Sequence, residues 1–152
     1  MALYLEFDEV VRRFRRMRMR YAVAGGLAVG LHGYVRATQD MDFLVHPMDL
    51  AKVETALVGL GYRANKETLE FARSGLLLKR FFKGLRRQSD VMVVDILIPT
   101  SARMRRVLAR AIRVPYRKSS LSVVTARDLI AMKRLRGSAT DKADIEYLRK
   151  GR

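Results

Sequence analysis

The amino-acid sequence predicts an α+β protein in which a sheet is flanked by helices and followed by a C-terminal helical segment. Three observations favour this class. The chain has 152 residues, 49% of them hydrophobic, which fits one domain with its own core. Short apolar segments of strand length are interleaved with helical patterns between residues 21 and 99. Beyond residue 99 helical patterns predominate. We therefore expect a single domain over residues 1–152.

The N-terminal segment carries the pattern of an amphipathic helix. Apolar residues recur there at steps of three and four, and arginines fill most of the other positions. A membrane-surface helix can show the same pattern, but so regular a stripe more often packs on its own domain. The apolar positions are Leu3, Phe7, Val10, Phe14, Met17 and Tyr21.

Two strands and two helical segments are expected next. The segment "YAVAGG" is typical of a buried strand that ends at Gly25 and Gly26, and a helical turn follows until Gly33. The segment "DMDFLVHP" predicts a second strand, ended by Pro47. Residues 49–60 predict a helix with an apolar face, capped by Gly61.

The remaining elements follow from the same reasoning. The segments "LLLKRFF" and "SDVMVVDILIP" predict two further strands, joined by a basic turn at residues 84–88. A helix is expected near residues 101–111, an extended segment at "LSVVT", a helix at residues 126–136 and a last helix from about Thr140.

The charge of the chain indicates a polyanionic partner. Lysine and arginine number 31 against 15 acidic residues, which gives a formal charge of +16. Such a field attracts RNA, DNA, nucleotides or anionic lipids, although a basic surface without a dedicated partner is the alternative. The absence of cysteine excludes disulfides and thiolate metal sites and favours a reducing compartment. No apolar run reaches the about 20 residues of a membrane helix, so we expect a soluble, cytoplasmic protein that does not bind membranes.

The glycine-rich segment "AGGLAVGLHG" matches neither of two common phosphate-binding motifs. The dinucleotide fingerprint requires glycine two positions after Gly25, where Leu27 stands. The Walker motif requires lysine and a hydroxyl residue where Leu31 and His32 stand. What remains is a tight Gly-Gly turn between a strand and a helix, where backbone N–H groups can approach a phosphate.

Three aspartates in predicted strands form the candidate metal site. Asp40 and Asp42 project from the same face of a strand, which places their carboxylates within about 7 Å of each other. A turn cap and a solvated carboxylate are the alternative for this pair. Asp95 interrupts an apolar strand, where a buried charge needs a partner or a metal, unless an edge strand turns it outward. Three carboxylates on neighbouring strands are the oxygen ligands that magnesium chemistry uses.

At these residues the sequence resembles a known family. The segments "GGLAVGLHGYVRATQDMDFLV", "VVDILIP" and "ARDLIAMKRLRGSATDKADIEYL" are similar to the minimal nucleotidyltransferases of the DNA polymerase beta superfamily, above all the toxin-type enzymes of bacterial abortive-infection systems. The resemblance covers about residues 20–150. It implies a mixed sheet with flanking helices, two Mg²⁺ ions (or Mn²⁺), a nucleoside triphosphate donor, and a toxin that an antitoxin-like protein could accompany.

The resemblance also implies roles for single residues. Gly25 and Gly26 receive the triphosphate, where many relatives have serine at the second position. Asp40 and Asp42 hold both metal ions, and Asp95 completes the site of the ion that activates the attacking hydroxyl. Nucleotide-binding roles are further implied for the following residues: Arg36, Thr38, Lys133 and Asp144.

Each of these secondary assignments has a structural alternative. Arg36 can be one more surface arginine, and Lys133, three and four residues after Ile130 and Leu129, can be a snorkelling lysine on the apolar face of its helix. Asp141 and Asp144 have the spacing of a helix cap and its third residue. For His32 and His46 a structural role is more common than a catalytic one.

The sequence is compatible with three functions. The first is transfer of a nucleoside monophosphate from a triphosphate to an acceptor hydroxyl, with RNA such as a transfer RNA as a plausible acceptor. The second is a non-catalytic module that binds RNA or a partner protein with the same fold. The third is a basic membrane-surface protein, which we rank last.

Overall fold

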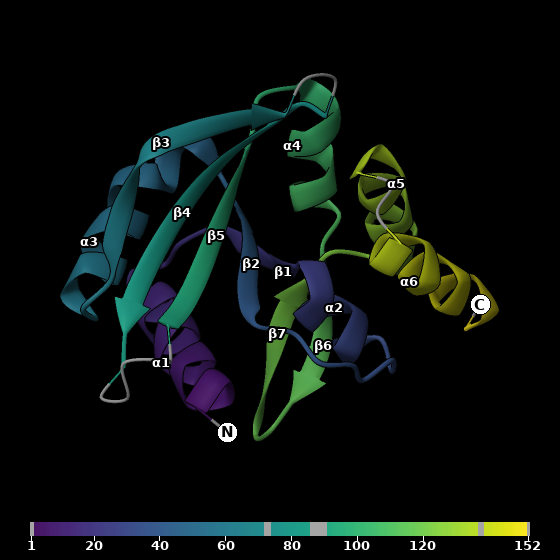
Figure 1. Ribbon diagram of the computed structural model, residues 1–152, viewed down its shortest axis with the longest axis horizontal. Helices are drawn as coiled ribbons and strands as arrows, with labels where there is room; N and C mark the ends of the chain where they lie inside the picture. Colours follow the sequence, from purple (N-terminus) through teal and green to yellow (C-terminus); the bar gives the residue numbers. More distant parts are fainter. Residues whose placement is uncertain (1, 72–73, 86–90, 137–138, 152) are drawn as a thin grey trace.

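A seven-stranded mixed sheet forms the centre of the computed structural model, which describes residues 2–71, 74–85, 91–136 and 139–151 (Figure 1). The strand order is β3-β4-β5-β2-β1-β7-β6. The strands are β1 (Tyr21–Ala24), β2 (Asp40–Val45), β3 (Arg63–Phe71), β4 (Leu76–Gly84), β5 (Val91–Pro99), β6 (Ile112–Tyr116) and β7 (Ser119–Val123). The helices are α1 (Ala2–Arg16), α2 (Gly25–Leu31), the 3₁₀ turn η1 (Pro47–Asp49), α3 (Leu50–Gly59), α4 (Ala102–Ala109), α5 (Ala126–Arg136) and α6 (Ala139–Lys150).

Both parallel and antiparallel pairs occur in the sheet. β2 runs parallel to β5, and β1 runs parallel to β7, whereas the other neighbouring strands are antiparallel. The sheet, the flanking helices and the C-terminal pair α5–α6 confirm the predicted α+β class. Among the described residues, no helix has the length and apolar content needed to cross a membrane.

Helices α1 and α3 pack on one face of the sheet, and the predicted aspartates project from the other. The ring of Phe7 on α1 stacks on Phe43 of β2 at a centroid distance of 5.8 Å, and the ring of Phe14 meets Phe43 edge to face at 5.1 Å. Figure 1 shows α1 and α3 on the same side of the strands, away from α2, α5 and α6. Because side chains alternate along a strand, Asp42 lies on the face opposite Phe43.

The chain leaves α1 earlier than the apolar stripe predicts. Helix α1 ends at Arg16, and Arg18 adopts a φ of 53°, which is incompatible with a continuing helix. Tyr21 fits both the apolar stripe and the predicted strand "YAVAGG", and it is the first residue of β1, so the strand prediction is confirmed and its match to the helical spacing was coincidental.

The sequence did not predict the two strands at the edges of the sheet. β3 has the sequence "RANKETLEF" and β6 the sequence "IRVPY". Polar residues dominate β3, and Pro115 in β6 is tolerated because an edge strand leaves one row of N–H groups unused. The other predicted elements are present with shifts of a few residues at their ends. Of the predicted basic turn, residues 86–88 lie outside the described residues.

Candidate active site

The three predicted aspartates come together on two adjacent parallel strands. In the register of β2 and β5, Asp42 lies directly opposite Asp95, and Asp40 lies opposite Val93. Adjacent strands are about 4.8 Å apart, so the three carboxylates leave one face of the sheet within a small area. Asp40 and Asp42 are half-buried, and Asp95 is 5% exposed.

Arg80 on β4 binds Asp95, and the sequence analysis did not single it out. The two residues are cross-strand neighbours, and the Arg80 guanidinium donates two hydrogen bonds to Asp95, from Nε to Oδ1 at 2.7 Å and from Nη2 to Oδ2 at 2.9 Å. This bond, with the charges of Asp95, Asp40 and Asp42, raises the pKa of Arg80. A signal was present, because two consecutive cations in an apolar strand must face opposite sides. Lys79, on the other side, pairs with Glu54 of α3.

The environment of Asp95 decides between the alternatives left open for it. β5 lies between β4 and β2, so the interpretation of Asp95 as an outward residue of an edge strand is wrong. Its partner in the structure is the Arg80 guanidinium. Within the described part of the chain, no group of three histidine, cysteine or acidic side chains is arranged to hold a metal ion. The metal site therefore stays a prediction, and in this structure the Arg80 guanidinium binds both oxygens of Asp95.

The glycine turn lies directly against this acidic face. Gly25 begins α2 with a φ of 59°, a left-handed conformation that favours glycine. A Cβ atom at this position would lie 1.8 Å from Oδ2 of Asp42, so any side chain here would displace the carboxylate. The structure thus places the backbone of Gly25 in contact with a predicted metal ligand.

Residues 32–39 connect α2 to β2 and fold back over the second glycine. A Cβ atom on Gly26 would lie 3.0 Å from both Nη2 of Arg36 and Oγ1 of Thr38. The Thr38 hydroxyl donates a hydrogen bond of 3.3 Å to the carbonyl oxygen of Asp40. Arg36 and Thr38 therefore surround the glycine turn, whereas their phosphate contacts stay predictions.

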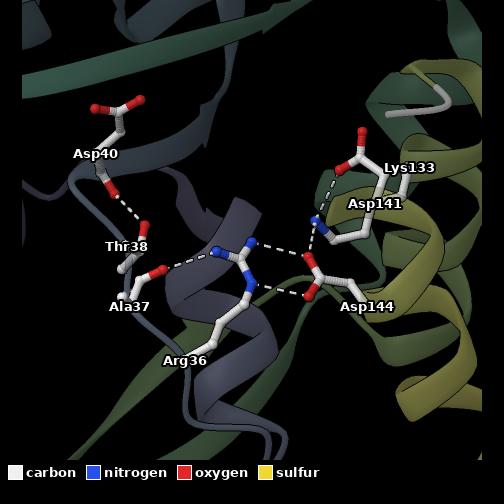
Figure 2. Close-up of polar contacts among 7 residues, drawn as sticks. All are labelled: Arg36, Ala37, Thr38, Asp40, Lys133, Asp141 and Asp144. Carbon is white, nitrogen blue, oxygen red and sulfur yellow. Dashed lines mark hydrogen bonds and ion pairs between the residues drawn. The ribbon is translucent and has the colours of Figure 1, made fainter. Parts of the chain in front are cut away.

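A buried ion network joins this connection to the C-terminal helices, as Figure 2 shows. Arg36 donates two hydrogen bonds of 2.8 Å to Asp144. Nζ of Lys133 lies 2.9 Å from Asp144 and 3.4 Å from Asp141. Both aspartates are fully buried, and Lys133 is 5% exposed. These contacts fix α5 and α6 against the segment that leads into Asp40.

The electrostatics of the network favour its charged form. Burial acts to raise the pKa of Asp144, but hydrogen bonds from Arg36 and Lys133 outweigh it, and the pKa lies below its ordinary value. The hydrogen bond to Asp144 in turn raises the pKa of Arg36. Lys133 does not snorkel to solvent, because its ammonium group is bound between two carboxylates. Nucleotide-binding roles for Arg36, Lys133 and Asp144 stay predictions.

The remaining polar assignments have structural explanations. Asp141 lies within the first turn of α6, which begins at Ala139, so its interpretation as the cap is wrong. Nε2 of His32 lies 2.9 Å from the carbonyl oxygen of Val124, and Nδ1 of His46 accepts a hydrogen bond from the N–H of Met48. Both histidines thus have the structural roles that were expected.

Comparison with solved structures identifies the fold. The chain superposes on a lincosamide antibiotic adenylyltransferase, LnuA, solved with lincomycin bound, with a TM-score of 0.68 and 16% identity over 97% of this chain and 96% of that one. It superposes on ANT(2")-Ia, solved with adenylyl-2"-tobramycin, with a TM-score of 0.57 and 11% identity over 99% and 98% of the two chains. A candidate nucleotidyltransferase from Thermotoga maritima gives 0.62 and 14% over 97% and 91%. No protein-family model matches the sequence, and comparison with curated proteins finds no match.

These superpositions define the class of fold. The chain has a minimal nucleotidyltransferase-like fold, as the resemblance implied. At identities of 16% or less the likeness concerns the arrangement of the backbone, and the activity has to be argued from the residues of the site.

Proposed function

We propose that the protein is a nucleotidyltransferase that moves a nucleoside monophosphate from a nucleoside triphosphate to an acceptor hydroxyl. The observation that carries this proposal is the contact between Gly25 and Asp42, because it joins a strand-to-helix turn of the kind that can bind phosphate to a pair of carboxylates. The cross-strand position of Asp95 adds the third carboxylate at the same place. The nucleotidyltransferase-like fold supports the same reading.

The donor set fits magnesium in kind. Magnesium is held in such sites by carboxylate oxygens together with substrate phosphates, and Asp40, Asp42 and Asp95 supply only carboxylates. The cluster already stabilises one cation, because the Arg80 guanidinium binds Asp95 and interacts favourably with the charges of Asp40 and Asp42. Two bound Mg²⁺ ions would lower the pKa of the acceptor hydroxyl and neutralise the leaving pyrophosphate.

The residues of the chain would then divide the work of the reaction. The Gly25–Gly26 turn would position the triphosphate, and Asp40 and Asp42 would hold the metal ions that neutralise its phosphates. Once Arg80 releases Asp95, the carboxylate of Asp95 accepts the proton of the acceptor hydroxyl. The acceptor oxygen forms a bond to the α-phosphorus, the bond from that phosphorus to its bridging oxygen breaks, and pyrophosphate leaves with the electron pair.

The net charge favours RNA, such as a transfer RNA, as the acceptor. A formal charge of +16 concentrates polyanions around the protein. The same field repels polycations, and an aminoglycoside such as the tobramycin bound to ANT(2")-Ia is a polycation. A toxin role with an antitoxin-like partner remains part of the proposal through the resemblance, and growth arrest on expression of the intact protein, absent for Asp42→Asn, tests it.

Label transfer tests the reaction itself. The protein is incubated with magnesium, pooled small RNA and each of the four ribonucleoside triphosphates labelled at the α-phosphate, beside an Asp42→Asn variant. The control variant Glu9→Gln removes an exposed carboxylate on α1, which packs on the opposite face of the sheet. We expect labelled RNA with the native protein and with Glu9→Gln but none with Asp42→Asn. Equal labelling by all three proteins would exclude the proposed site.

A non-catalytic RNA-binding module on the same fold is the second candidate. The bond between Arg80 and Asp95 favours it, because a permanently bound Asp95 could not accept a proton. Titration of a triphosphate with and without magnesium separates the two functions. Affinity that does not depend on magnesium, together with no labelled product, would favour the binding module.

A further inference from the structure

An arginine-lined cavity of about 740 Å³ lies away from the aspartates. It is formed where β1 begins and β2 ends, together with α4 and the hairpin β6–β7. The six residues of β2 rise about 20 Å, which separates Asp40 at one end from His46 just beyond the other. Along β1, Tyr21 lies four residues before Gly25, about 13 Å at ~3.3 Å per residue, so the cavity lies near the Gly25–Gly26 turn but does not include it.

Hydrogen-bond donors and positive charge dominate the lining. Four arginines and no acidic residue line the cavity. Arg20 is bound by Asp49, with its Nε at 3.0 Å from Oδ2. Within the described part of the chain, Arg105 and Arg106 of α4 and Arg113 of β6 form no ion pair, so three like charges line the cavity without an acidic partner. Such a lining attracts an anion, since each neighbouring guanidinium otherwise repels the others.

Tyr21 is a buried polar residue in the lining of the cavity. It is 7% exposed, its ring packs on Phe14 and Phe43, and its hydroxyl lies near the guanidinium of Arg15 without a hydrogen bond of ordinary length. Buried polar groups that lack such a bond are rare in folded proteins and call for an explanation. Burial raises the pKa of the Tyr21 phenol, so the hydroxyl keeps its proton and can donate it in a hydrogen bond.

His46 adds an imidazole to the lining. Its Nδ1 accepts a hydrogen bond from the N–H of Met48, which leaves Nε2 as the ring atom for a ligand contact. The cavity thus presents guanidinium, phenol and imidazole groups together. This set matches the oxygen atoms of phosphate groups, which accept several hydrogen bonds and carry negative charge.

We infer that this cavity binds the phosphodiester backbone of an RNA acceptor, with Arg105, Arg106 and Arg113 contacting its phosphates and Tyr21 donating to a phosphate oxygen. The inference rests on the proposed function for the choice of RNA. The distance of about 20 Å along β2 between His46 and Asp40 is one that a strand of several nucleotides can span.

A matched pair of triple variants tests the site. Arg105→Ala, Arg106→Ala and Arg113→Ala are combined in one protein, and the control combines Arg16→Ala, Arg103→Ala and Arg149→Ala. Both lose three charges from exposed positions, and Arg103 lies on the same helix as Arg105 and Arg106 but does not line the cavity. Affinity for a fluorescent 12-nucleotide RNA is measured between about 50 and 200 mM salt. This range gives the slope of log affinity against log salt concentration, which changes by about 0.7 for each phosphate contact on a single strand.

The expected result is a selective loss in the cavity variant. Its slope of log affinity against log salt should fall by about two, with an affinity at least about tenfold weaker, whereas the control keeps the native slope. Tyr21→Phe removes only a hydroxyl and should weaken RNA binding a few-fold without changing the slope. Equal losses in both triple variants, or native affinity in the cavity variant, would overturn the inference.

Two further arms separate the ligand sources and the two proposals. Tripolyphosphate should displace the 12-nucleotide RNA poorly, and displacement at matched phosphate concentration would assign the cavity to small anions and overturn the choice of RNA. Asp42→Asn should bind the RNA like the native protein. If the native protein binds RNA through the cavity but transfers no label, the inference stands and the proposed function fails. If the native protein and the cavity variant transfer label equally at limiting RNA, the proposed function stands and the inference about the cavity fails.

Discussion

Two pairs of aspartates in this molecule have the same composition and opposite environments. Asp40 and Asp42 lie on a strand, half-buried, beside a glycine turn that leaves the carboxylate of Asp42 in contact with backbone. Asp141 and Asp144 lie on α6, fully buried, and share the cation of Lys133. The first pair lies beside the glycine turn that is predicted to receive a triphosphate, and the second is enclosed by the protein's own cations.

The difference between the pairs predicts catalysis for the first and a structural role for the second. Removal of a buried carboxylate that the chain itself neutralises leaves its partner cations buried without compensation, which destabilises the fold. Asp95 is intermediate, because it is buried like Asp144 but its cation, Arg80, has a side chain that is 39% exposed. An arginine with access to solvent can leave, whereas Lys133 at 5% exposure cannot leave without opening the helix pair.

Substitution of Asp144 should produce the largest change in stability. Asp144→Asn leaves Arg36 without its bidentate partner and removes one of the two carboxylates of Lys133, and breaking a buried ion pair costs about 3–5 kcal/mol. Chemical denaturation measures the loss. Glu146→Gln, on the same helix but exposed, should change the free energy of unfolding by less than about 0.5 kcal/mol. Similar values for the two variants would contradict a structural role for the network.

Substitution of Gly25 should act on the first pair instead. A methyl group at this position would meet Oδ2 of Asp42 at 1.8 Å and force a left-handed conformation on alanine, so Gly25→Ala should reduce transfer by about 10²-fold. Gly26→Ala meets only the ends of flexible side chains at 3.0 Å and should retain most of the activity. Steady-state kinetics on both variants tests the contrast, and the reverse order of effects would place the triphosphate elsewhere.

Removal of the Arg80 guanidinium should strengthen metal binding. If Arg80 competes with a divalent cation for Asp95, Arg80→Gln should bind Mn²⁺ about tenfold more tightly, since one competing positive charge is lost beside three carboxylates. Electron paramagnetic resonance of free Mn²⁺ measures this affinity without any assay of activity. Lys79→Gln, on the opposite face of β4, is the control. Unchanged or weaker Mn²⁺ binding in Arg80→Gln would mean that Arg80 does not occupy the cation position.

The pH dependence of stability should show a smaller effect from the second pair. The pKa of Asp144 lies below its ordinary value of 3.8 in the folded protein, so the unfolded chain binds the proton first. The stabilisation is complete above pH 3.8 and is lost as the pH falls through the lower, folded pKa. Asp49, held by Arg20, has a lowered pKa and acts in the same direction. Thermal unfolding between pH 6 and pH 3 should therefore be less pH-dependent in Asp144→Asn than in the native protein.

Features that depend on neighbouring residues could be predicted from the sequence, whereas contacts between residues far apart in the chain could not. Period-two alternation was enough to place Asp40 and Asp42 on one face, and the apolar surroundings of Asp95 indicated a buried charge. The partner of Asp95 could not be named, because Arg80 is 15 residues away and meets it only through strand pairing. The bond between Arg36 and Asp144 spans 108 residues. The edge strands β3 and β6 were missed because a strand with one solvent-exposed edge needs little apolar sequence.

The central claim is that Asp42 does the chemistry and Asp144 holds the structure. Transfer of α-phosphate label to RNA, measured per folded molecule for Asp42→Asn and Asp144→Asn at a temperature where both are folded, tests it most directly. We predict a loss of about 10³-fold or more for Asp42→Asn and a change of less than about tenfold for Asp144→Asn. A comparable loss in the two variants, or full activity in Asp42→Asn, would contradict the account.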